Sequence, residues 1–143
     1  MHLGGVLAAY TLGAMYEVTV EQVFRAAHAI TLAGQREQTH EHEWRVRVVV
    51  GGQEVNHDGV LCDFHWLQRQ LDVILAPLEN QDLNAVAPFD RVNPTAEHVA
   101  RHIAEAIGAV LPAGLALRRA TVTEAPGCTA TYRPQRPRSA GGA

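Results

Sequence analysis

The segment HEHEWRVRVVV, at positions 40–50, alternates between two kinds of side chain. Histidines and large apolar residues occupy the even positions up to 50, while Arg45 and Arg47 occupy odd ones. Because successive side chains of a strand point to opposite sides, this pattern predicts a half-buried antiparallel strand. The residues expected on its inner face are His40, His42, Trp44, Val46, Val48 and Val50.

A second strand is expected upstream of this segment, over residues 16–28. The residues that share one face of that strand are Val18, Val20, Phe24, Ala26 and His28. Downstream, Gly51-Gly52 predicts a turn, and residues 59–63 predict a short returning strand. Two closing strands, over 115–124 and 129–132, are expected near the end of the chain.

Two helices are expected between these strands. The first follows Asp63, which is a helix-capping residue type, and ends before Pro77. The second is capped by Thr95 and ends before Pro112. Residues 80–84, between the helices, are polar and predict a loop. The order β-β-(β)-α-α-β-β predicts an α+β fold: a four-stranded antiparallel sheet with two helices on one face.

The chain has 143 residues, enough for one domain. We expect that domain over residues 15–132, between an N-terminal extension (1–14) and a flexible tail (133–143). The extension lacks a cationic start and is shorter than the ~20 residues of a membrane-spanning helix, so we expect neither a signal peptide nor a membrane partner. The two cysteines lie far apart in the sequence, which favours a reducing cytoplasm.

Charge narrows the classes of function. The net charge is −3, and no basic run is longer than Arg118-Arg119, which argues against nucleic acid and anionic lipid as partners. All twelve basic residues are arginines. The absence of lysine excludes Schiff-base chemistry and a P-loop lysine.

Three histidines are spaced as metal ligands. His40 and His42 would project from the same face of one strand, and His28 would lie on the same-parity face of the neighbouring strand. Three imidazoles can hold one zinc ion and leave a fourth tetrahedral position open. The alternative is a chance His-x-His pair beside an ordinary half-buried histidine.

Two carboxylates are candidates for the same site. Glu37, three residues before His40, is either a solvated loop residue or a base. Glu124, near a strand end, either discourages sheet-to-sheet pairing or accepts two parallel N–H bonds from a guanidine-like ring edge.

Several segments together resemble the 6-pyruvoyl-tetrahydropterin synthase / 6-carboxytetrahydropterin synthase family over roughly residues 15–132. They are Phe24-Arg25-Ala26-Ala27-His28, His40-Glu41-His42, Asp63-Phe64, Asp82-Leu83-Asn84, Asn93 to Ala100, and Val122-Thr123-Glu124. The resemblance implies zinc bound by His28, His40 and His42, and a pterin whose pyrimidine edge is anchored by Glu124. It also implies the tunnelling fold, a homohexamer built as a dimer of trimers, and pterin sites between subunits.

The chain departs from the family pattern at its proton-transfer positions. Arg36 stands where family members acting on dihydroneopterin triphosphate usually carry cysteine, and Glu79-Asn80 stands in place of Asp-His. Asn does not accept and return a proton at neutral pH. Glu41 replaces the glycine between the zinc-binding histidines and is a second, weaker candidate for proton transfer.

Glu37 matches a glutamate that one subgroup of the family uses to cleave the dihydroneopterin side chain to 6-hydroxymethyl-dihydropterin. The resemblance therefore indicates a zinc-dependent lyase with altered or lost activity on dihydroneopterin or its triphosphate. A non-catalytic pterin-binding homologue is the alternative, and a structural oligomer with an empty pocket is a third.

Overall fold

The long central ladder of the sheet forms as the alternation predicts. The structure is a computed structural model that describes residues 15–135, so the expected extension (1–14) and residues 136–143 of the expected tail lie outside the described residues. Strands β1 (Tyr16–His28) and β4 (His40–Gly52) pair antiparallel along their whole lengths. This ladder carries the three candidate metal ligands.

Three further strands complete the sheet. β6 (Ala116–Ala125) pairs with the other side of β4, and β7 (Cys128–Tyr132) pairs with β6. β5 (Gln81–Asp82) adds two residues parallel to β1, which gives the order β5-β1-β4-β6-β7. The α+β fold is therefore confirmed, with one very short parallel strand beyond the four antiparallel strands predicted.

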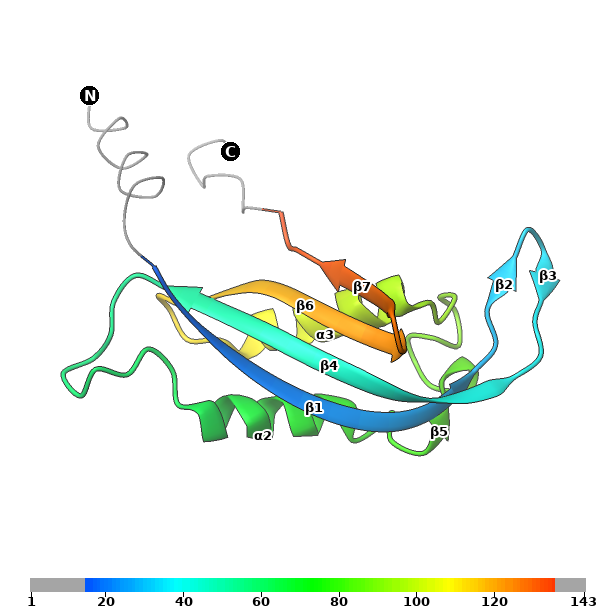
Figure 1. Cartoon of the computed structure of the whole chain (residues 1–143), viewed down its shortest axis with the longest axis horizontal. Coiled ribbons are helices and arrows are strands. Elements are labelled where there is room, and N and C mark those ends of the chain that lie inside the picture. Colours follow the sequence, from blue (N-terminus) through cyan, green and yellow to red (C-terminus); the bar gives the residue numbers. More distant parts are fainter. Residues whose placement is uncertain (1–14, 136–143) are drawn as a thin grey trace, which may run out of the picture.

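The two helices cover one face of this sheet, as predicted. α2 (Phe64–Leu75) packs against β1, and α3 (Ala96–Val110) packs against β6 and β7 (Figure 1). Asp63 and Thr95 cap them through side-chain oxygens that accept backbone N–H groups. The buried side chains between helices and sheet include Trp44, which is fully buried. None of the helices in the described part of the chain is long and apolar enough to cross a membrane.

Two local predictions are wrong. Gly51 and Gly52 do not turn the chain but end β4, where a Cβ on Gly52 would lie 2.8 Å from Leu61 Cδ1. The same Cβ would lie 3.0 Å from the backbone oxygen of Gly114, so close packing, rather than turn geometry, favours glycine at position 52. Residues 59–63 form no strand, because the side chain of Asn56 accepts backbone N–H groups from Asp58 and Val60 and folds the segment on itself.

Two short segments, for which the sequence analysis predicts neither strand nor helix, are ordered beside the histidines. β2 (Thr31–Leu32) and β3 (Gln35–Arg36) form a hairpin that extends beyond the ends of β1 and β4 (Figure 1). β5 is followed by one turn of 3₁₀ helix, η1 (Leu83–Ala85), capped by the Asp82 side chain. Both segments lie next to the end of β1: the hairpin follows it in the chain, and β5 pairs with Ala26 and Ala27.

Candidate metal centre

Four side chains converge where β1 ends, β4 begins and β6 ends. His28 lies directly opposite His40 in the β1–β4 ladder, and Ala26 lies opposite His42, so the three imidazoles share the covered face of the sheet. Glu124 reaches them from β6. One ligand atom from each of the four residues lies within 4.8 Å of all the others. The structure thus brings together the three predicted histidines and the predicted Glu124.

The distances within this cluster fit a small divalent ion. Four donors at about 2.1 Å from a tetrahedral ion are separated from each other by roughly 3.4 Å. The Nε2 atoms of His28 and His40 are 3.1 Å apart, and Oε1 of Glu124 lies 2.8 Å from Nε2 of His28 and 3.9 Å from Nε2 of His42. These separations straddle the tetrahedral value.

In two of the rings, the hydrogen bond made by the nitrogen that faces away from the cluster determines which nitrogen carries the proton. Nδ1 of His28 donates to the Pro94 carbonyl over 2.7 Å, and Nδ1 of His40 donates to the Gln38 carbonyl over 2.9 Å. A carbonyl oxygen only accepts, so each neutral ring has its proton on Nδ1 and a bare lone pair on Nε2. Two bare nitrogens and a carboxylate oxygen thus face one another, and such a donor set calls for a cation between them.

His42 completes the set in its metal-binding form. Burial lowers the pKa of His42 below its ordinary value; the charge of Glu124 opposes this shift, and the rings of His40 and His28 add to it. The imidazole is therefore neutral at pH 7, which is the form that binds metal ions.

Glu124 owes its direction to an irregularity in the sheet. Thr123 pairs with Thr129 in the β6–β7 ladder, but the next pair joins Ala125 to Cys128, so Glu124 is the extra residue of a β-bulge. A bulge bends its strand and re-aims side chains. The carboxylate of Glu124 consequently points at the histidines from the end of β6.

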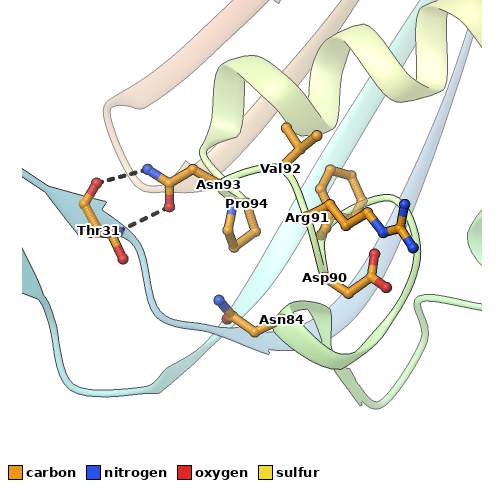
Figure 2. A pocket seen from close by; sticks show the side chains of 8 residues that line it. Thr31, Asn84, Asp90, Arg91, Val92, Asn93 and Pro94 are labelled. Atoms are coloured by element: carbon orange, nitrogen blue, oxygen red, sulfur yellow. Dashed lines mark hydrogen bonds between the residues drawn. The ribbon is translucent and has the colours of Figure 1, made fainter. Parts of the chain in front are cut away.

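Two asparagines hold the backbone that follows His28. The Asn84 side chain accepts from Ala29 N over 2.8 Å and donates to Ala29 O over 2.9 Å. Asn93 makes the same pair of bonds to Thr31, at 2.9 Å each (Figure 2). Each side-chain amide thereby makes the pair of backbone hydrogen bonds that a neighbouring strand would otherwise make. The recess beside them, of about 300 Å³, is lined by Pro94, whose carbonyl orients His28.

Sequence reasoning missed these positioning residues. Asn93 stands two residues before the predicted helix cap Thr95, and Asn84 falls in a predicted polar loop. Their partners Thr31 and Ala29 lie 62 and 55 positions away. The one available signal was that both asparagines fall inside segments that carry the family resemblance.

Glu37 lies beside the cluster, behind the ring of His40. Its Oε1 accepts from Ile30 N over 3.0 Å and lies 3.6 Å from Nδ1 of His40, the nitrogen turned away from the converging donors. Its backbone N–H donates to Ile30 O, also over 3.0 Å. Glu37 therefore closes the base of the β2–β3 hairpin in this structure.

The other residues singled out from the sequence lie elsewhere. Glu41 projects from the opposite face of β4, where Oε1 lies 3.0 Å from the guanidinium of Arg25. Arg36 lies exposed in the hairpin. The Glu79 carboxylate accepts from the backbone N–H of Arg25, and Asn80 donates its backbone N–H to the Arg25 carbonyl. Within the described chain, none of these four side chains joins the cluster of donors.

Comparisons with known proteins agree with this architecture. The family model described as 6-pyruvoyl tetrahydropterin synthase matches residues 17–135. A search of curated protein sequences finds no match. Among solved structures, the 6-pyruvoyl tetrahydropterin synthase of Caenorhabditis elegans superposes with a TM-score of 0.76 at 19% identity, covering 86% of this chain and 98% of the other.

Two Plasmodium proteins share the same fold. The 6-pyruvoyl tetrahydropterin synthase of Plasmodium vivax superposes with a TM-score of 0.69 at 19% identity, covering 86% of this chain and 99% of the other. That of Plasmodium falciparum gives 0.67 at 20% identity, covering 84% and 98%. At such low identities these matches establish the tunnelling fold of those structures for this chain.

Proposed function

Because this chain belongs to the 6-pyruvoyl tetrahydropterin synthase family, we propose that it is a zinc-dependent pterin lyase whose reaction differs from the family's usual one. The observation that carries the proposal is the convergence of three imidazoles and one carboxylate around a space that fits a tetrahedral ion. Its substrate class is a dihydropterin with a hydroxylated side chain, and its expected compartment is the cytoplasm.

The donor set favours zinc. Neutral imidazoles with a carboxylate suit this ion, whereas magnesium and calcium prefer oxygen ligands. His28, His40 and His42 would hold it. When bound, zinc supplies Lewis acidity toward side-chain hydroxyls of the substrate. His28 and His40 contribute by keeping their protons on Nδ1, through Pro94 and Gln38, so that Nε2 faces the site.

Glu37 is the proposed base. It lies next to His40 and is partly exposed, and its proton-accepting group is of the right type for cleavage of a carbon–carbon bond beside a hydroxyl. A catalytic residue of the P. vivax protein, replaced by cysteine or alanine in two further structures, is also a glutamate. To act on a substrate at the metal, Glu37 has to exchange its bond to Ile30 N. Glu41, on the other face of β4, is the weaker candidate.

The replaced positions argue against triphosphate elimination. Arg36 supplies no thiol, and Asn80 does not transfer protons. General acid–base groups contribute about 10²–10⁴-fold each, so conversion of dihydroneopterin triphosphate to a pyruvoyl or carboxy product should be slow or absent. The same replacements favour the second candidate function, a pterin-binding homologue without turnover.

Assembly enters the proposal because the resemblance places pterin sites between subunits. We expect a homohexamer made of two trimers, with Glu124 contributing to recognition of the pyrimidine edge of the pterin. Size-exclusion chromatography with light scattering measures the assembly. Monomer at micromolar protein concentration would contradict it.

The test of function is incubation of zinc-loaded protein with dihydroneopterin and, separately, with its triphosphate, with products identified by mass. Side-chain cleavage to 6-hydroxymethyl-dihydropterin is expected, and Glu37→Ala should abolish it while zinc and pterin binding persist. Glu105→Ala, an exposed acidic residue on α3, is the matched control. Efficient triphosphate elimination by the unmodified protein, or undiminished cleavage by Glu37→Ala, would overturn the assignment of Glu37 as the base. If the unmodified protein binds a pterin but forms no product from either substrate, the non-catalytic homologue is favoured.

A further inference from the structure

We propose that Glu124 is the fourth protein ligand of the metal in the ligand-free protein, so that a ligand must displace its carboxylate to bind the metal. The inference rests on the proposed metal site. It replaces the open fourth position expected from the three histidines alone with a closed one.

The first argument is the position of the carboxylate oxygen. Oε1 of Glu124 lies 2.8 Å from Nε2 of His28 and 3.9 Å from Nε2 of His42. These two distances lie on either side of the 3.1 Å between His28 Nε2 and His40 Nε2. All four ligand atoms lie within 4.8 Å of one another, so the carboxylate oxygen is spaced from the ring nitrogens as a fourth ligand of one ion would be.

The second argument is that the backbone directs Glu124 inward. As the extra residue of the β6–β7 bulge, Glu124 points along the covered face, and its side chain is only 26% exposed. The acidic residues on the outer face of β4 behave differently: Glu43 contacts Arg25 and Arg45 and is 49% exposed. Among the described residues, the basic groups within 4 Å of the Glu124 carboxylate are the imidazoles of His28 and His42 rather than an arginine. In their neutral form these rings do not balance its charge, whereas a divalent ion would.

The consequence concerns access to the metal. Closed four-ligand sites are typical of structural zinc, whereas catalytic zinc keeps one position for water or substrate. Displacement of Glu124 would open that position and release a carboxylate beside the incoming molecule. The same residue could then serve first the metal and afterwards the ligand.

Metal affinity and ligand affinity should respond in opposite directions. Cobalt(II) is used as the probe metal, because its visible absorption reports the coordination number, and azide is used as the probe ligand. Glu124→Ala should weaken cobalt binding by about tenfold or more, measured by competition with a chelator, while azide binds the cobalt-loaded variant at least about tenfold more tightly. For Glu124→Gln, both the cobalt affinity and the azide affinity should lie between those of the unmodified protein and those of Glu124→Ala.

Glu43→Gln is the matched control, because it removes the same charge from the opposite face of the sheet. It should leave both affinities unchanged. Equal cobalt affinity, an unchanged spectrum and unchanged azide binding in Glu124→Ala, which must first show a native circular dichroism spectrum, would overturn the fourth-ligand role alone. Failure of the unmodified protein to bind cobalt or zinc would overturn the metal site itself and the proposed function with it.

Discussion

The two faces of the β1–β4 ladder use the same spacing for opposite purposes. On the covered face, His28, His40 and His42 are brought together, and the Nδ1 atoms of His28 and His40 are held by the carbonyls of Pro94 and Gln38. On the open face, Arg25–Glu41 and Glu21–Arg47 form ion pairs in solvent. Burial makes the geometry of a polar group costly to disturb, whereas solvent screens an exposed pair. Function is therefore expected on the face where polar groups are constrained.

The largest contrast should come from adjacent residues on the two faces. Trp44 is fully buried, stacks on Phe24 with ring centroids 5.8 Å apart and donates to the Ala26 carbonyl. Trp44→Ala should lower the free energy of unfolding of the metal-free protein by about 3–5 kcal/mol. Arg45→Ala should change it by less than about 0.5 kcal/mol. Urea titration at one protein concentration measures both, and similar losses would contradict the contrast.

Metal content provides the next contrast. His40→Ala removes one of the converging donors and should reduce metal affinity by at least about 100-fold, because the second shell alone controls about 10–100-fold. Glu41→Ala, one position along and on the other face, should retain one metal per chain. Elemental analysis after dialysis decides, and full retention by His40→Ala would remove that histidine from the site.

The asparagine that holds Ala29 allows a test of positioning apart from coordination. Asn84→Ala leaves two backbone groups without their partner and should weaken metal binding by about 10–100-fold, by loosening the segment after His28. Asn56→Ala also removes two hydrogen bonds to backbone, but in the distant 56–60 loop. Isothermal titration with zinc should show a loss only for Asn84→Ala. Equal affinities in the two variants would mean that His28 needs no such support.

The open face should yield a small coupling energy. Arg47 and Glu21 approach to 2.7 Å on neighbouring strands, and both side chains are more than half exposed. A double-mutant cycle with Arg47→Ala and Glu21→Ala should give about 0.2–1 kcal/mol, and less at high salt. A coupling well above this range would show that another subunit buries the face.

The smallest expected effect is a pH dependence at His102 on α3, away from the metal. Burial lowers the pKa of His102, whose ring packs edge-on against Phe89, while Glu105 opposes the shift. Between the lowered folded pKa and the unfolded value of about 6.5, only the unfolded chain binds the proton. The stability contributed by neutral His102 is thus complete above pH 6.5 and is lost as the pH falls through the folded pKa. Urea midpoints at several pH values should show a shallower loss in His102→Gln.

Patterns that extend over many residues predict most of the fold. Side-chain alternation indicates the strands β1 and β4 and the side chains that face the helices, and the capping residues Asp63 and Thr95 indicate where both helices begin. The strand at 59–63 failed because Asn56 offered the backbone a local partner, which an apolar run does not reveal. A two-residue strand such as β5 has too short a pattern to be recognised.

The site was predictable in its ligands and unpredictable in its arrangement. Strand parity placed the three histidines on one face, and the family resemblance indicated Glu124. The proximity of Glu124 to His28 depends on a bulge that shifts the register by one residue, and no sequence period encodes such a shift. The hydrogen bonds that hold the backbone of Ala29 and Thr31 come from asparagines more than fifty residues away in the sequence.

The paired bonds of Asn84 make this centre sensitive to conversion of that amide to a carboxylate. Deamidation converts an asparagine amide to a carboxylate and replaces its donor with a second acceptor. At Asn84 this would set a negatively charged oxygen against the Ala29 carbonyl, where a 2.9 Å hydrogen bond now exists. The repulsion would act on the residue that follows His28, so the centre could be damaged over the lifetime of the protein with every histidine intact.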